Sequence, residues 1–263
     1  IKNFPKFIPL RFNLAIMYRN LGLIELSIKT HIEILEDDQF NSNSYYELST
    51  MYDFSNHNEQ LKTLLNIEIG NLSPMEKIYF CYSKSNAYHN NKDYKKSAYF
   101  LKIANDEKLK IQPSDLKKKL NTGEYFRNLK IDQNLNLEEV KDSNQYVFIV
   151  GMPRCGSTLL ESILSLNPEV KDLGEVPFLE ESLQKSDDLL EVRKLYQEKV
   201  MLVNSKQQIF TDKNLFNFLY CPIIYELFPN ARIIHCIRNP LDNILSIYRT
   251  NFLNQSFSSS LND

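Results

Sequence analysis

Residues 146–166 read YVFIVGMPRCGSTLLESILSL, and this stretch decides the fold of the second half of the chain. Residues 146–150 are a continuous β-branched and aromatic run, which predicts a strand buried on both faces. A turn with two glycines follows over residues 151–156, and residues 157–166 predict an amphipathic helix that ends before Pro168. A strand, a glycine loop and a helix in this order are the setting of a phosphate-binding loop, whose backbone N–H groups hold phosphate oxygens.

The chain after this loop continues to alternate between strands and helices. Residues 208–211 and 232–238 predict strands, the second of them buried. Residues 214–228 predict a helix, and Pro240 begins another, because proline is favoured in the first turn of a helix. Alternating strands and helices predict a P-loop-like, three-layer α/β domain with a parallel sheet. In such sheets ligands bind at the carboxyl ends of the strands.

The first half of the chain predicts one helix after another, with an internal repeat. Three tyrosines lie 34 and 36 residues apart, at Tyr18, Tyr52 and Tyr88, and a second set nine residues on keeps the same spacing. A period of about 34 residues is typical of tetratricopeptide (TPR) helical hairpins. The middle repeat is degenerate, and a non-repeating helical bundle is the alternative.

The change of pattern divides the chain into two domains, so the fold class is α followed by α/β. Residues 1–126 are the TPR-like helical region, residues 127–144 a polar linker, and residues 145–263 the α/β domain. The run of three lysines at 117–119 falls on a predicted helix, where the side chains spread around the surface, so we interpret it as a solvated face.

Composition excludes several classes of protein. The net charge of −2 argues against binding of nucleic acid through bulk positive charge. No window is apolar enough to span a bilayer, so we expect no membrane partner. The chain has no signal-peptide pattern and no initiator Met, so we allow for residues before Ile1. Its four cysteines form no metal-ligand spacing and predict thiols in the cytoplasm, with no metal site.

The glycine loop lacks one residue of an ATP-binding loop. The pattern G-x-x-x-x-G-K-[ST] requires Lys where this chain has Ser157, which argues against a P-loop kinase or ATPase. An ordinary strand–turn–helix connection is the other alternative. Arg154, Ser157 and Thr158 all offer groups that bind anions, and they favour a phosphate site.

Two motifs resemble those of sulfotransferases that use 3′-phosphoadenosine 5′-phosphosulfate (PAPS). PRCGSTL at 153–159 is similar to the 5′-phosphosulfate loop of that family, and Arg238 with Ser246 eight residues later is similar to its 3′-phosphate motif. Residues 228–242, FPNARIIHCIRNPLD, look like bacterial sulfotransferases that carry TPR repeats in front of the catalytic domain and are related to tyrosylprotein sulfotransferases. Departures from the family pattern occur at Cys155, Ser157, Ile237 and Asn239.

The resemblance implies a role for each residue of the two motifs and for two others. It implies that the 5′ side of PAPS is bound by Arg154, Cys155, Gly156, Ser157 and Thr158. It implies that Arg238 and Ser246 bind the 3′-phosphate, that Lys213 stabilises the leaving group, and that Glu175 is the general base. We interpret Glu180 and Glu181 as surface charges and His235 as a core residue.

The resemblance also implies a metal-independent sulfotransferase whose catalytic domain is incomplete at the C-terminus, because family members continue beyond the second motif. A TPR adaptor with a catalytically inert α/β domain is the alternative from another class. The sequence does not identify the acceptor of the sulfuryl group. A protein or peptide bound on the TPR face, a glycan and a small molecule remain open.

Overall fold

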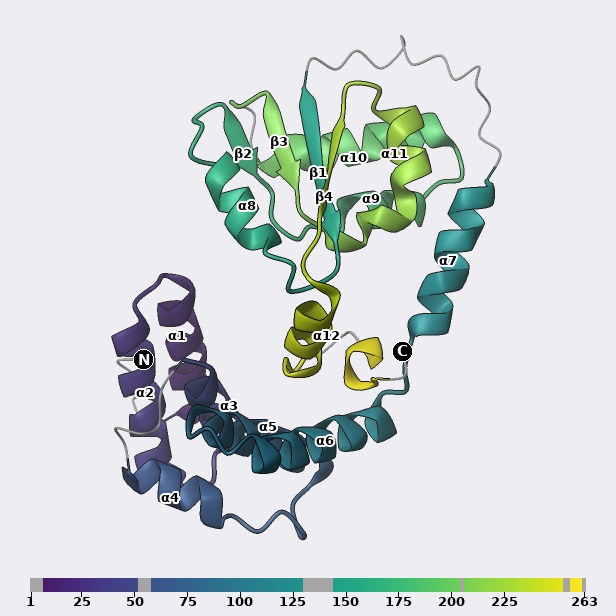
Figure 1. Cartoon of the computed structure of the whole chain (residues 1–263). Helices are drawn as coiled ribbons and strands as arrows, with labels where there is room; N and C mark the ends of the chain where they lie inside the picture. Colours follow the sequence, from purple (N-terminus) through teal and green to yellow (C-terminus); the bar gives the residue numbers. More distant parts are fainter. Residues whose placement is uncertain (1–6, 52–57, 130–143, 204–205, 253–255, 262–263) are drawn as a thin grey trace. The chain divides into compact units, whose positions relative to one another are not determined.

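The computed structural model describes residues 7–51, 58–129, 144–203, 206–252 and 256–261. The chain forms two compact units (Figure 1). The first comprises Ile1–Asp115 with Tyr248–Asp263, and the second comprises Leu116–Ile247. These limits differ from the predicted domains, because residues 116–126 fall in the second unit and residues 248–263 in the first. Most of the predicted linker, residues 130–143, lies outside the described residues.

The first unit begins with a series of helices, which we call the helical array. They are α1 (Ile8–Asn20), α2 (Ile24–Asp37), α3 (Ser42–Met51), α4 (Asn58–Asn66), α5 (Pro74–Asn90) and α6 (Tyr94–Ile111). Consecutive helices α1 and α2, and α5 and α6, pack against each other, and α3 packs between α2 and α5. Buried side chains such as Leu48, Leu64 and Phe80 form the core of the array.

Two of the helical hairpins have the same turn and the same internal hydrogen bond. Gly22 (φ 76°) and Lys92 (φ 61°) take the left-handed conformation at corresponding positions of the α1–α2 and α5–α6 turns. The hydroxyl of Ser27 donates to the carbonyl of Ala15 at 2.8 Å, and that of Ser97 donates to Ser85 at 2.9 Å. The sequence repeat therefore corresponds to a repeat of local structure, while the assignment to TPR stays a prediction.

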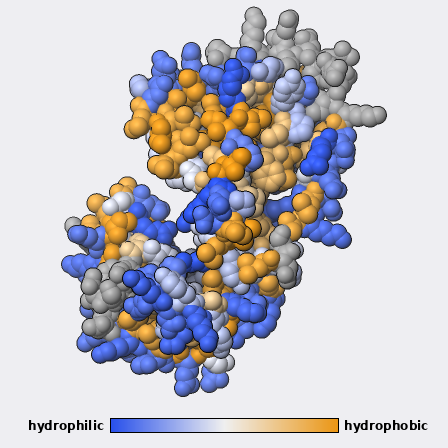
Figure 2. Space-filling model, in the orientation of Figure 1, coloured by the Kyte–Doolittle hydropathy of each residue, from blue (hydrophilic) through white to orange (hydrophobic). Residues whose placement is uncertain are grey.

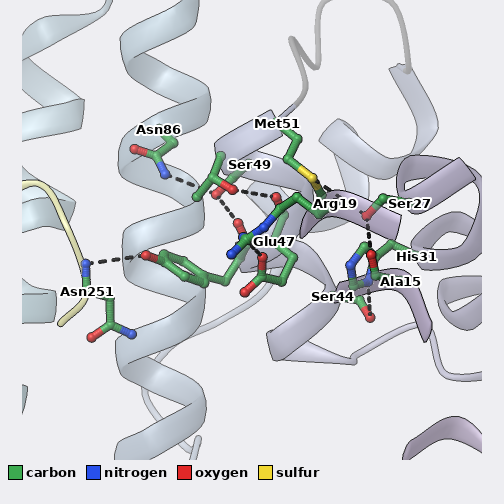
Figure 3. Close-up of polar contacts among 12 residues, drawn as sticks. Ala15, Arg19, Ser27, His31, Ser44, Glu47, Ser49, Met51, Asn86 and Asn251 are labelled. Carbon is green, nitrogen blue, oxygen red and sulfur yellow. Dashed lines mark hydrogen bonds and ion pairs between the residues drawn. The ribbon is translucent and has the colours of Figure 1, made fainter. Parts of the chain in front are cut away.

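The interior of the array also contains a polar network (Figure 3). His31 and Ser44 are fully buried, with 3.3 Å between Nδ1 of His31 and Oγ of Ser44. Arg19 and Glu47 form an ion pair between α1 and α3. Burial, and secondarily the Arg19 charge, lower the pKa of His31 to about 4, so this imidazole is neutral at pH 7.

The second unit is a parallel sheet with helices. Its elements are α7 (Leu116–Asn128), β1 (Gln145–Gly151), α8 (Ser157–Leu164), β2 (Val170–Asp172), α9 (Phe178–Leu183), α10 (Leu189–Val203), β3 (Ile209–Asp212), the 3₁₀-helix η3 (Leu215–Tyr220), α11 (Cys221–Leu227), β4 (Arg232–Cys236) and α12 (Pro240–Tyr248). The strand order is β2-β3-β1-β4, and all three pairings are parallel. The predicted combination of a helical region and a parallel α/β sheet is therefore confirmed.

One face of β1 lies in an aromatic core. Tyr146, Phe148 and Val150 alternate along the strand and pack with Tyr196 of α10 and with Phe228. Side chains of α9 and α11 complete the same cluster. Helix α8 packs against β1 and β2 and leaves large apolar side chains exposed, which Figure 2 shows as hydrophobic surface on the face that carries α8.

Two predicted elements differ from the structure. The helix predicted at 214–228 is divided into η3 and α11, because Pro222 in the first turn of α11 has no N–H to continue the hydrogen bonds of the preceding turn. The strand predicted to be buried, β4, pairs with β1 alone among the described strands and is largely exposed. The prediction that His235 is a core residue is therefore wrong, because its side chain lies exposed on this edge strand.

Candidate active site

Each of the four strands ends just before a residue predicted for the site. β1 ends at the glycine loop, β2 ends three residues before Glu175, β3 directly before Lys213, and β4 two residues before Arg238. Because all four strands are parallel, their carboxyl ends meet at one edge of the sheet, which is where ligands bind in open α/β sheets. The parallel sheet thus brings segments from four separate parts of the sequence to the same edge.

The glycine loop requires both of its glycines, for different reasons. A Cβ on Gly151 (φ 152°) would lie 2.6 Å from the carbonyl oxygen of Cys236, its register partner on β4, so the two strands approach too closely for a side chain. Gly156 (φ 97°) has open space around it but a left-handed backbone that favours glycine. Arg154 is also left-handed (φ 68°). Ser157 is buried at the first position of α8, whose free N–H groups form the usual anion site of such loops.

Residues of the two predicted motifs contact each other. Nε of Arg154 donates to Oγ of Ser246 at 3.2 Å, and Nη1 of Arg238 donates to the carbonyl of Arg154 at 3.1 Å. Asn243 of α12 donates to the carbonyl of Pro153 at 2.7 Å. The structure therefore joins the glycine loop to α12, and both guanidinium groups are exposed and able to receive an anion.

Lys213 and Glu175 form an ion pair, with 2.7 Å between Nζ and Oε1. The lysine is 5% exposed, whereas the Glu175 side chain is 66% exposed. The backbone N–H of Lys213 also donates to the carbonyl of Gly174 at 2.9 Å, which fixes the two segments side by side. The lysine and the glutamate predicted for catalysis are therefore in direct contact, although their roles stay predictions.

Residues 146–201 and 186–263 match the model described as the Sulfotransferase family. This part of the chain resembles a sulfotransferase family. A curated relative, described as an uncharacterized protein of Aquifex aeolicus (strain VF5), is 33% identical over 133 residues, which cover 42% of this chain and 18% of that protein. The chain thus spans less than a fifth of the length of that relative. No solved structure matches the chain.

Sequence reasoning missed a buried carboxylate in the matched region, Glu161 of α8. Its Oε1 accepts from Oγ1 of Thr211 at 3.0 Å and from the N–H of Gly174 at 3.3 Å, and its Oε2 lies 3.9 Å from Nζ of Lys213. Glu161 is 6% exposed, and burial raises its pKa against the opposing effects of Thr211 and Lys213. The sequence signal for Glu161 was a charged residue on the apolar side of a short amphipathic helix, where charged residues are rarely buried unless they are paired.

A second buried carboxylate, Asp212, fixes the end of β3. It accepts from Oη of Tyr196 at 3.1 Å, from Nδ2 of Asn217 at 3.0 Å and from the N–H of Asn214 at 3.0 Å. Burial raises the pKa of Asp212 to about 7, against the effect of these hydrogen bonds. Asp212 therefore holds the strand end in place directly beside Lys213, without an ion pair in the described part of the chain.

Two further predictions concern metals and membranes. Within the described ranges, no three His, Cys, Asp or Glu side chains gather as a metal site would require. In the same part of the chain, no helix combines the length and the apolar character that crossing a bilayer demands. All four cysteines are free thiols.

Proposed function

We propose that this chain binds PAPS at the carboxyl edge of its sheet and transfers the sulfuryl group to a hydroxyl or amine of an acceptor. The contact of Arg154 with Arg238 and Ser246 carries this proposal, because it brings together the two motifs predicted to bind phosphate. The two arginines are 84 residues apart in the sequence. The match of residues 146–263 to a sulfotransferase family supports the same reaction class.

The chemistry of the donor agrees with the groups available. The N-terminus of α8 with Arg154–Thr158 suits the 5′-phosphosulfate, and the absence of the P-loop lysine at Ser157 suits a donor without a triphosphate. Arg238 and Ser246 would hold the 3′-phosphate, because a guanidinium forms paired hydrogen bonds with phosphate oxygens. ATP has no 3′-phosphate, so this clamp would distinguish PAPS from ATP.

In the proposed reaction an acceptor oxygen attacks sulfur while the bond from sulfur to the bridging phosphate oxygen breaks. Glu175 takes the acceptor proton, and Lys213 donates a hydrogen bond to the departing oxygen. The products are a sulfate ester and adenosine 3′,5′-bisphosphate. An ammonium has three N–H donors, so Lys213 can keep its contact with Glu175 while it turns another donor to the leaving oxygen. No step of this reaction requires a metal ion.

The acceptor and the cellular location are two further parts of the proposal. A protein or peptide bound by the helical array, a glycan and a small molecule are all compatible acceptors, and we expect neither a nucleic-acid nor a membrane partner. Free thiols at all four cysteines suit a reducing compartment, so we propose a cytoplasmic location. A TPR adaptor with an inert α/β domain is the second candidate, and a P-loop kinase a third.

Thermal unfolding with adenosine 3′,5′-bisphosphate tests the donor site. A ligand at 100 times its Kd stabilises a protein by about 2.7 kcal/mol, so we expect a clear rise in the midpoint without metal. Arg238→Ala should abolish the rise, while Arg232→Ala, an exposed arginine at the opposite end of β4, should keep it. Stabilisation by Mg·ATP alone would favour a kinase, and no response to either nucleotide would favour the inert adaptor.

Turnover of PAPS with a panel of phenols, alcohols and tyrosine peptides tests the catalytic roles. Glu175→Gln should keep bisphosphate binding and lower turnover by about 10²–10⁴, the usual contribution of a general base. Glu180→Gln, an exposed glutamate five residues away in α9, should leave turnover unchanged. Normal turnover in Glu175→Gln would exclude Glu175 as the base.

A further inference from the structure

The first unit contains residues that follow the whole second unit in the sequence. We call residues 248–252 and 256–261 the return segment. It includes the end of α12, a non-helical stretch and the 3₁₀-helix η4 (Ser256–Ser259), which contacts α6. The partners of the return segment in the first unit precede it in the sequence by more than 140 residues, so these contacts are among the longest in sequence separation.

Side chains of the array bind main-chain groups of the return segment. Nδ2 of Asn105 donates to the carbonyl of Tyr248 at 3.1 Å, and Nζ of Lys108 donates to the carbonyl of Phe252. The N–H of Asn251 donates to Oη of Tyr46 at 3.3 Å, as Figure 3 shows beside the polar network of the array. Farther along, the N–H of Phe257 donates to Asp115 at 3.2 Å. Main-chain groups in a non-helical stretch need such partners when they are covered.

Asn105 and Lys108, the two residues of α6 that bind the return segment, are both buried. Asn105 is fully buried; its Oδ1 accepts from Oη of Tyr82 at 2.8 Å, and its Nδ2 also donates to Leu101 at 3.0 Å. Lys108 is 5% exposed and forms no ion pair with any residue that the structure describes, so a carbonyl takes the place of a carboxylate. Burial lowers the pKa of Lys108 to about 8. A buried ammonium is costly unless it is hydrogen-bonded, so the array without the segment would bear an unpaired polar group.

Side chains of the segment add contacts that depend on its sequence. Tyr248 packs on the apolar cluster formed by Ile78, Tyr82 and Leu101, and Phe257 is 8% exposed. Nη1 of Arg249 lies 3.0 Å from Nε2 of His89. The segment therefore has an aromatic anchor on each side of its main-chain contacts, as a bound peptide has.

We propose that Tyr46, Asn105 and Lys108 form a peptide-binding face whose resident ligand is the return segment of the same chain. This face holds main chain through buried donors and acceptors, and Tyr248 and Phe257 determine which peptide it holds. A foreign peptide, including a peptide acceptor, reaches this face only by displacing the return segment. The inference does not depend on the reaction that the second unit catalyses.

Trypsin cleavage after Arg249 in the full chain measures whether the segment is held. Lys108→Met and Asn105→Leu should speed this cleavage at least tenfold, and Tyr46→Phe, which removes only the acceptor hydroxyl, should speed it less. Lys102→Met is the matched control, because Lys102 is an exposed lysine on the same helix whose ion pair is with Asp106 of that helix. Equal cleavage rates in the wild type and in Lys108→Met would overturn the proposal, as would cleavage within α5 and α6 that accelerates in parallel.

Binding in trans separates a peptide-binding face from ordinary packing. The full chain with Tyr248→Ala and Phe257→Ala should release its segment and bind a fluorescent synthetic peptide of residues 248–261, whereas the wild type should bind it at least tenfold more weakly. Adding Lys108→Met to the double variant should abolish binding. Failure of the double variant to bind the peptide, with its circular dichroism unchanged, would overturn the proposal.

Discussion

Substitution of the loop glycines tests the geometry of the candidate active site most directly. A Cβ on Gly151 would lie 2.6 Å from the carbonyl oxygen of Cys236 and 3.4 Å from the sulfur of Cys155. The oxygen belongs to the backbone of the neighbouring strand and cannot rotate away. Gly156 has a positive φ of 97° but no heavy atom within 4 Å of its Cβ position. Gly70 has neither constraint. Alanine at Gly151 therefore tests a steric clash together with backbone strain, alanine at Gly156 tests backbone strain alone, and alanine at Gly70 is the control for both.

The expected losses of stability follow from this difference. Gly70→Ala should change the free energy of unfolding by less than about 0.5 kcal/mol, as surface substitutions usually do. Gly156→Ala should cost about 1–2 kcal/mol, the penalty of a left-handed conformation for a residue with a Cβ. Gly151→Ala adds about 1–3 kcal/mol of overpacking to a similar strain, or roughly 2–5 kcal/mol in all. At about 2–4 °C per kcal/mol, Gly151→Ala should lower the midpoint of unfolding by roughly 10 °C.

Thermal unfolding followed by circular dichroism provides the measurement, with urea unfolding as a second estimate of the free energy. We expect the order Gly151→Ala, then Gly156→Ala, then Gly70→Ala, from most to least destabilised. Unfolding of Gly151→Ala at the same temperature as Gly156→Ala would show that β1 and β4 do not approach closely enough at Gly151 for a Cβ to clash, and would refute the predicted order. Bisphosphate binding should weaken in both loop variants and persist in Gly70→Ala.

Three further predictions concern other parts of the molecule. Glu161→Gln changes the buried carboxylate beside Lys213 and should lower the free energy of unfolding in urea by about 1–3 kcal/mol. Glu169→Gln, at an exposed position, should change it by less than about 0.5 kcal/mol. Equal values for the two variants would show that the contacts of Glu161 do not stabilise the fold. The pKa of His31 is about 4 in the folded state, against an ordinary 6.5 in the unfolded state. As the pH falls, the unfolded state therefore takes up the proton first. The free energy of unfolding is at its full value above pH 6.5 and should fall by up to about 3 kcal/mol as the pH drops to 4. Urea midpoints at pH 7 and 4.5 measure this loss, which His31→Leu should reduce and the exposed His235→Leu should not. Ser27→Ala and Ser97→Ala should each cost about 1–2 kcal/mol, because each removes a buried hydrogen bond at the same place in a hairpin; a difference larger than about 1 kcal/mol would mean that the two hairpins are not equivalent.

Local signals predicted most of the elements around the site. The apolar run at 146–150, the glycine loop, the strand predicted at 208–211 (observed at 209–212) and the helix from Pro240 are all present, because each depends on residues that are close in sequence. The period of the tyrosines also corresponds to hairpins with matching turns. The three residues of β2 are too few for any period to be visible, and their strand exists because β3 lies beside them.

Features that depend on distant residues could not be predicted. The apolar character of β4 indicated a buried strand, but burial depends on neighbours on both sides, and β4 pairs with β1 alone among the described strands. The position of Glu161 in the site depends on its contacts with Thr211 and Lys213, which are about 50 residues away in the sequence. The return segment gave no signal that it joins the array, because the array side chains bind its main-chain carbonyl groups, and such contacts leave no pattern in the composition of the segment. The roles of Glu175, Lys213, Arg238 and Ser246 stay predictions that the experiments above address.

The first unit is discontinuous in the chain, and this has a consequence for folding. In the sequence, the second unit is inserted between the array and the return segment. During translation Lys108 is therefore synthesised 144 residues before Phe252, whose carbonyl it binds. Closing a flexible loop of that length costs about 4 kcal/mol of entropy, and folding of the inserted unit first would remove most of that cost. We therefore expect the sheet to form before the array reaches its final stability, so that translation order and folding order differ in this protein.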